Sequence, residues 1–149
     1  MIINFYSEIR SKIPFGQKFV NKIISQAIKE LKIKRNFEIT ILLVNDKKIK
    51  DLNNQFRKKN KVTDVLSFSQ KEGGKIILPK QANDYLGDII ISYPQIKRQA
   101  QKFKHSAEKE FALISIHGLL HLLGYEDETK SGYLKMEKVL AKILEKIYV

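Results

Sequence analysis

The most informative stretch of this chain is residues 117–127, with the sequence His-Gly-Leu-Leu-His-Leu-Leu-Gly-Tyr-Glu-Asp. His117 and His121 lie four residues apart, so on a helix both imidazoles stand on one face and can reach one ion. Gly124 is placed to end that helix, because glycine adopts the left-handed conformation of a helix terminus at little steric cost. The reversed chain can then bring Asp127 back toward the histidines. The stretch therefore predicts a helix that ends at a metal site.

Two imidazoles and one carboxylate form a ligand set suited to a catalytic zinc ion. Three protein ligands leave one corner of a tetrahedron for a water molecule, which the metal acidifies. We therefore predict one Zn²⁺ per chain, held by His117, His121 and Asp127. The alternative is an apolar core helix that merely contains two histidines, but the spacing, the glycine and the acid together favour the metal. His105, the third histidine, lies among lysines and is expected to be a solvated surface residue.

The length and composition predict one domain that spans residues 1–149. The chain has no cysteine, which excludes disulfides and thiolate metal sites and fits a reducing compartment. The first residues do not resemble a signal peptide, and no uncharged run approaches the length of a membrane span. We therefore expect a cytoplasmic protein with no membrane partner.

The net charge of +12 is unevenly distributed along the chain. Residues 1–106 contain 22 Lys and Arg against 9 Asp and Glu, whereas residues 107–149 contain 6 against 7. A basic surface beside a neutral-to-acidic metal pocket suits a polyanionic substrate such as a nucleic acid. The competing explanation is codon bias, because the chain has 24 lysines and only 4 arginines.

Hydrophobic periodicity predicts an α+β domain with a mixed four-stranded sheet covered by about five helices. Asn45 and Ser106 are placed to cap two of the helices. The segment 70–84 is rich in glycine, lysine and polar residues and is predicted to be a loop or a loose hairpin. The predicted strands are 2–6, 37–44, 62–69 and 85–92, and the predicted helices are 15–31, 46–56, 94–103, 107–123 and 129–147.

Three motifs occur in the order found in one known family: 52–57 (Leu-Asn-Asn-Gln-Phe-Arg) running into 63–68 (Thr-Asp-Val-Leu-Ser-Phe), then 86–92 (Leu-Gly-Asp-Ile-Ile-Ile-Ser), then 117–125. Over essentially its whole length the chain resembles the YbeY endoribonuclease family. The resemblance implies a metal-dependent, single-strand-specific endoribonuclease, a hydrolase that acts on phosphodiester bonds. It further implies a role in rRNA maturation at the 3′ end of the small-subunit rRNA and in ribosome quality control. Single-stranded RNA, rRNA and the small ribosomal subunit are the expected partners, and DNA is not.

The chain departs from the family pattern at its third metal ligand, which is a histidine in the family and Asp127 here. A carboxylate lowers the net charge of the site by one unit relative to a third histidine. We therefore predict a metal-bound water that is less strongly acidified than at a three-histidine site. Oxygen ligation also makes harder divalent ions such as manganese more acceptable.

Phosphodiester cleavage needs a nucleophile, stabilisation of the charge on the phosphate oxygens, and protonation of the leaving oxygen. The metal can serve the first two needs, either through its water or by polarising the phosphate for attack by a ribose hydroxyl. Arg57 is the predicted catalytic residue for the remaining charge, because its planar guanidinium matches two phosphate oxygens, and the resemblance also places it in the active site. The alternative is a solvated arginine in a lysine-rich segment. Asp64 and Asp88 could orient ligands, although capping of local backbone amides is the expected role of each.

Two other functions are compatible with the sequence. The ligand spacing is also that of metzincin-like zinc proteases with the last histidine exchanged. Those enzymes carry a general-base glutamate directly after the first histidine, where this chain has Gly118, so that Glu126 or Glu128 would have to replace it. The second alternative is a non-catalytic ribosome- or RNA-binding factor with a structural metal and a basic surface.

Overall fold

The computed structural model describes residues 1–70 and 84–148. Within these ranges the chain forms four strands and five helices. Their order is β1 (Ile2–Ser7), α1 (Gln17–Glu30), β2 (Glu38–Val44), α2 (Asp46–Arg57), β3 (Val65–Ser69), β4 (Tyr85–Ser92), α3 (Tyr93–Phe103), α4 (Ala107–Leu122) and α5 (Lys130–Ile147). The predicted loop over 70–84 lies, apart from its two end residues, outside the described residues.

The four strands form one sheet in the order β1-β2-β4-β3. β2 pairs in parallel with both β1 and β4, whereas β3 runs antiparallel to β4. All residues of the two central strands, β2 and β4, are buried, which agrees with their nearly continuous apolar sequences. The predicted α+β fold with a mixed four-stranded sheet is confirmed.

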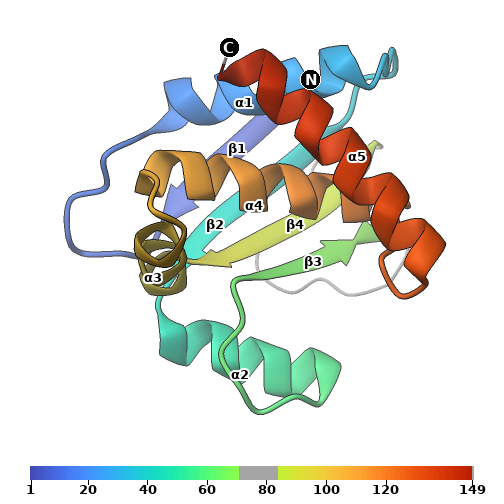
Figure 1. Cartoon of the computed structure of the whole chain (residues 1–149). Coiled ribbons are helices and arrows are strands. Elements are labelled where there is room, and N and C mark those ends of the chain that lie inside the picture. The colour runs from blue at the N-terminus through green and yellow to red at the C-terminus, as the bar shows by residue number, and fades with distance from the viewer. Residues whose placement is uncertain (71–83, 149) are drawn as a thin grey trace.

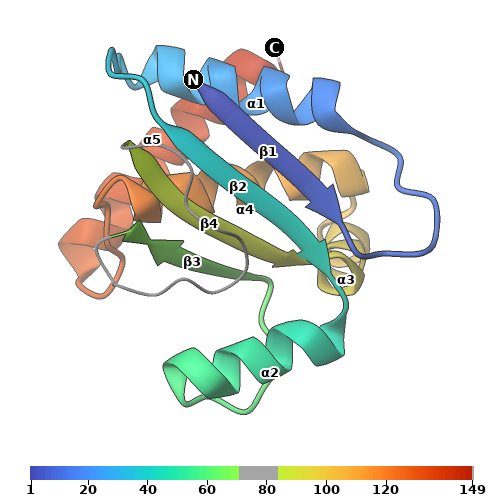
Figure 2. The ribbon, with the colours of Figure 1, turned by 180° about the vertical axis from the view of Figure 1, so that it is seen from behind.

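Three helices cover one face of the sheet, and one helix lies on the other side at one end of the strands (Figures 1 and 2). α1, α4 and α5 lie on one face, with α4 running across the middle of the sheet, and α2 packs on the other face. Because side chains alternate along a strand, β2 contributes Ile39, Ile41 and Leu43 to the core beneath α4 and Leu42 and Val44 to the smaller core beneath α2. α4 packs against the sheet and against α1, α3 and α5, which gives a rigid support to the residues at its end.

Side-chain caps fix the start of four of the described helices, α3 among them, where Ser92 Oγ accepts from the Gln95 amide. Asn45 Oδ1 accepts a hydrogen bond from the Lys48 amide at 2.8 Å at the start of α2, and Ser106 Oγ accepts from the Lys109 amide at 3.1 Å at the start of α4. Both predicted caps are confirmed. Thr129 has the same role at the start of α5.

Candidate metal centre

The C-terminal end of α4 reverses the chain through a hydrogen-bonded turn. The Tyr125 amide donates to the Leu120 carbonyl at 3.0 Å, and the Gly124 amide donates to the His121 carbonyl at 3.1 Å. Gly124 has a φ of +101°, as expected for the glycine that closes a helix in this motif. The turn sends residues 125–127 back along the last turn of α4, which is the reversal that the sequence predicted.

This reversal brings the three predicted ligands together. The Nε2 atoms of His117 and His121 lie 3.1 Å apart, and Asp127 Oδ2 lies 3.8 Å and 3.6 Å from them. Ligands that bind zinc tetrahedrally at about 2.0–2.1 Å are separated from one another by about 3.3 Å, close to all three distances. Among the residues that the structure describes, this is the one group of three histidine, cysteine or acidic side chains able to share an ion.

Each imidazole has a feature that suits metal binding. His121 Nδ1 lies 3.2 Å from the Tyr125 carbonyl oxygen, which can only accept, so that the ring donates from Nδ1 and its Nε2 atom is the one that faces the other ligands. Burial, followed by the neighbouring His121, lowers the pKa of His117, and this outweighs the opposing effect of nearby carboxylates such as Asp127. Neutral His117 is therefore favoured near pH 7, and a neutral imidazole is the ligand form.

Gly118 allows α4 to lie directly on the sheet. A Cβ atom at this position would stand 2.8 Å from Cγ2 of Ile89 and 3.1 Å from Oγ of Ser67, and Ser67 Oγ donates to the Gly118 carbonyl at 3.2 Å. A glutamate directly after the first histidine, as in the metzincin-like alternative, would therefore collide with β4. The geometry argues against that alternative.

Glu126 cannot replace the missing glutamate, because its carboxylate caps the start of α5. It accepts hydrogen bonds from the amides of Glu128 and Thr129 at 2.9 Å and 3.3 Å and from the Thr129 hydroxyl at 3.0 Å. These bonds, the Thr129 hydroxyl first, lower the pKa of Glu126. The residue next to Asp127 thus holds the turn in place, with one oxygen bonded to backbone amides and the other to the Thr129 hydroxyl.

Arg57 lies in the same cavity as the three ligands. The cavity has a volume of about 700 Å³, and Lys59 and Lys61 also line it. The Arg57 guanidinium donates to the Ser67 carbonyl at 2.8 Å and lies 4.8 Å above the ring of Phe68. The structure therefore brings together all four side chains that the sequence singled out, in a cavity lined by cationic groups and by the ligand cluster.

The remaining candidates fall into different environments. The prediction for His105 is wrong: its side chain is only 19% exposed and its Nε2 lies 2.6 Å from Oε1 of the buried Glu110. Asp88 accepts a hydrogen bond from the Tyr85 hydroxyl and points to the face of the sheet away from α4, since it neighbours Thr40 there. Asp64 lines the cavity of the ligand cluster and a second cavity beside it.

Comparison with known proteins shows the family of the chain. A family model described as "Endoribonuclease YbeY" matches residues 4–148. The chain belongs to the YbeY family. A relative named endoribonuclease YbeY from Phytoplasma australiense is 40% identical over 99% of this chain and 96% of its own length, and another from Limosilactobacillus reuteri is 34% identical over 97% and 96%. The solution structure of a Thermotoga maritima protein superposes with a TM-score of 0.60 at 28% identity, covering 97% of this chain and 91% of that one.

Proposed function

We propose that this YbeY family member is a metal-dependent endoribonuclease that cleaves single-stranded RNA in the cavity between Arg57 and the ligand cluster. The observation that carries the proposal is the convergence of His117, His121 and Asp127 on a space of ionic size, in one cavity with Arg57. Membership in a family named for endoribonucleases supports the choice of RNA, and so does the positive charge of the chain.

The residues divide the chemistry among them. A divalent ion bound by the three ligands would supply positive charge and an acidified water. Arg57 is held by Ser67 and Phe68 with its plane fixed, which suits a fork that binds two phosphate oxygens. Lys59 and Lys61 add positive charge along the same wall and attract the RNA backbone without reading its sequence.

Asp127 adjusts the properties of the site. Its carboxylate is more exposed than either imidazole, at 37% against 21% and 29%, and it brings a negative charge to the ion. We expect zinc to bind with a less acidified water than at a three-histidine site, and manganese to be accepted more readily.

The biological role extends from the family to this chain. We propose that the substrate is rRNA, with cleavage at the 3′ end of the small-subunit rRNA, and that the enzyme acts in ribosome quality control in the cytoplasm. The proposed partners are single-stranded RNA and the small ribosomal subunit. Among the described residues, every helix is too short or too polar to cross a bilayer.

A cleavage assay tests the activity. Wild-type protein loaded with zinc or manganese should cut a single-stranded RNA and leave the corresponding duplex intact, and a chelator or His117→Ala should stop the cutting. Cleavage of casein by the loaded protein would instead support the protease. Salt-sensitive RNA binding without turnover, with either ion, would support the RNA-binding factor.

A further inference from the structure

A second cavity adjoins the metal centre on the side of α3. Its volume is about 690 Å³, and Asp64 and His117 line both cavities, so the two are adjacent. Leu113, Ile114 and Leu140 supply apolar surface, while α3 supplies glutamines and cations. A cavity with an apolar surface and a few fixed polar groups is suited to a flat heterocycle.

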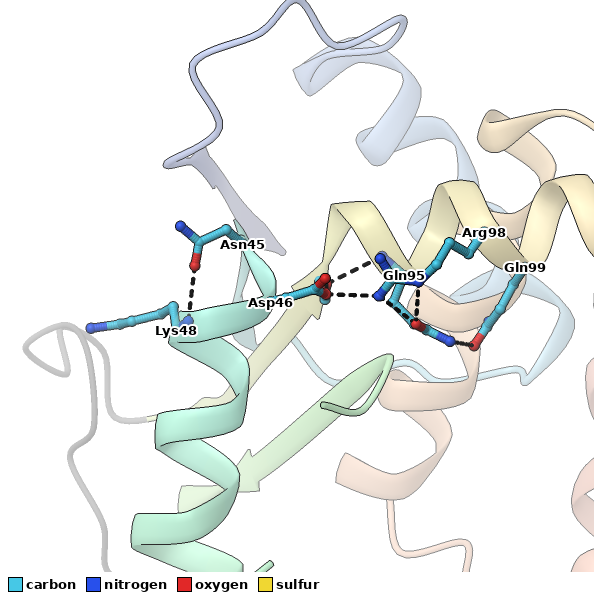
Figure 3. Close-up of polar contacts among 7 residues, drawn as sticks. Asn45, Asp46, Lys48, Gln95, Arg98 and Gln99 are labelled. Carbon is cyan, nitrogen blue, oxygen red and sulfur yellow. Dashed lines mark hydrogen bonds and ion pairs between the residues drawn. The ribbon is translucent and has the colours of Figure 1, made fainter. Parts of the chain in front are cut away.

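One wall of this cavity is a continuous chain of hydrogen bonds that starts at α2 and runs along α3 (Figure 3). Arg98 bonds Asp46 at 2.9 Å and Gln95 at 2.6 Å, and Gln95 bonds Gln99 at 3.0 Å. Gln99 in turn bonds the buried Glu110 at 2.8 Å. The wall is thus anchored at both ends by charged residues, which fixes the rotamers of the two glutamines between them.

The charged ends also fix the direction of every hydrogen bond in the wall. Because a guanidinium only donates and a carboxylate only accepts, the Gln95 oxygen faces Arg98, the Gln95 nitrogen donates to Gln99, and the Gln99 nitrogen donates to Glu110. The Gln99 nitrogen directs its second hydrogen to Asp64 Oδ2 at 3.4 Å, whereas the Gln95 nitrogen keeps a second hydrogen and the Gln99 oxygen keeps a second lone pair. The wall therefore holds a donor and an acceptor side by side, the combination that complements the edge of a nucleobase.

An exposed aromatic ring lies at the end of the same cavity. Phe103, the last residue of α3, lines the cavity and is 57% exposed, the largest value among the exposed large hydrophobic side chains of the described residues. Lys102 Nζ lies 5.6 Å from the centre of its ring. An aromatic face accompanied by a cation is the usual platform on which proteins stack an unpaired base next to its phosphate.

We propose that this cavity is a subsite for one unstacked nucleobase of the RNA, next to the phosphodiester held at the metal centre. Phe103 stacks on the base, and the Gln95 and Gln99 amides contact its edge. This inference rests on the proposed function, because it names where the substrate of that site is held. It gives single-strand specificity a physical cause: a base in a duplex cannot leave its stack without paying for unpairing.

RNA oligonucleotides with one cleavage site, each lacking the base at a single position, test the subsite. With wild-type protein, removal of the base beside the cleaved bond should lower kcat/KM about tenfold, and removal of distant bases should have little effect. Phe103→Ala should lower kcat/KM on intact RNA about tenfold and make the enzyme insensitive to loss of that base. Phe103→Tyr should restore the wild-type pattern, because it retains the aromatic face.

Tyr6→Ala is the matched control, since Tyr6 is an aromatic residue of β1 that is 50% exposed and belongs to neither cavity; it should behave as wild type. Two results would overturn the subsite: equal sensitivity to every missing base, or effects of Phe103→Ala and of base removal that are independent and simply multiply. In either case, cleavage of the RNA would still support the proposed function. If no RNA is cut, fluorescence anisotropy with the same oligonucleotides tests the subsite by binding alone. A loss of affinity that depends on the position of the missing base, and that vanishes in Phe103→Ala, supports the subsite. The same affinity for every oligonucleotide, or no binding, overturns it.

Discussion

The two ends of α4 each bring histidine and carboxylate together, but with opposite geometry. At the N-terminal end, Glu110 is only 2% exposed and its two oxygens are taken by His105 at 2.6 Å and Gln99 at 2.8 Å. At the C-terminal end, the Asp127 oxygen stands 3.6 Å and 3.8 Å from two rings and is accessible to solvent. The first arrangement satisfies its polar groups internally. The second spaces its ligand atoms as an ion between them would require.

The comparison predicts that the two ends respond to mutation in different observables. The C-terminal end should control metal affinity, and the N-terminal end should control the free energy of unfolding. Zinc affinity and the free energy of unfolding can both be measured for His105→Ala and for His121→Ala, so each variant serves as the control for the other.

The largest expected effect is on metal binding. His121→Ala removes one of three ligands and should weaken zinc affinity at least about 1000-fold, or about 4 kcal/mol. His105→Ala should leave zinc affinity within about threefold of wild type, because His105 pairs with Glu110 and not with the ligand cluster. Competition with a chromophoric chelator measures both. Similar losses in the two variants would show that the distinction between the ends of α4 is wrong.

The second effect is on stability and should have the reverse order. In the presence of a chelator, His105→Ala leaves the Glu110 carboxylate buried beside Gln99 alone and should cost about 2–3 kcal/mol of unfolding free energy. His121→Ala removes a part-exposed ring that bonds the Tyr125 carbonyl and the His117 ring, and should cost about 1 kcal/mol. Urea unfolding followed by circular dichroism gives both values. A greater loss in His121→Ala would contradict the structural role of the His105 pair.

A smaller effect is expected for the third ligand. Asp127→Ala should weaken zinc affinity about 10- to 100-fold, less than the loss of a histidine because the carboxylate is the most exposed of the three. Asp127→His supplies the third histidine of the family pattern. The ratio of zinc affinity to manganese affinity should be higher in this variant than in the wild type. Isothermal titration with each ion tests this. Unchanged zinc affinity in Asp127→Ala would remove Asp127 from the ligand set.

The smallest effect concerns pH. Burial lowers the pKa of His117 below the ordinary value of 6.5. In the absence of metal, this ring therefore stays mostly neutral at pH 6.5 and becomes protonated only at a lower pH. Its contribution to zinc affinity should therefore be constant above about pH 6.5 and weaken by at most about tenfold per pH unit once the pH falls below its own pKa. Zinc titrations between pH 5 and pH 8 measure the curve. Affinity that rises on acidification would contradict a neutral imidazole ligand.

Much of the fold could be predicted because its signals are local. The apolar runs of β2 and β4, the helical spacing of α1 and α5, and the caps Asn45 and Ser106 all depend on neighbours a few residues away. The strand order β1-β2-β4-β3 could not be predicted in this way, because it depends on pairing between segments that are distant in sequence.

The same distinction explains the outcome for the site. His117, His121 and Asp127 share one helix end and its turn, so local geometry sufficed to bring them together. His105 was assigned to the surface from its lysine neighbours, whereas its environment depends on Lys104, whose left-handed conformation (φ +58°) separates α3 from α4. Glu110, five residues further along the chain, is the residue that could have indicated this pairing. The first turn of the capped helix brings its carboxylate back to His105.

The hydrogen-bonded wall beside the site also left only a faint trace in the sequence. Gln95 and Gln99 have the i, i+4 spacing of a helical pair, but nothing local shows that Asp46 of α2 and Glu110 of α4 anchor its two ends. Those contacts join three helices and arise only when the sheet is assembled.

The central claim is that one ion binds between His117, His121 and Asp127 at the C-terminal end of α4. Anomalous diffraction at the zinc edge from crystals of the zinc-loaded protein tests it most directly. We expect one peak per chain, about 2 Å from the Nε2 atoms of both histidines and from an Asp127 carboxylate oxygen. A peak beside His105 and Glu110, or no peak at the end of α4 in fully loaded protein, would contradict it.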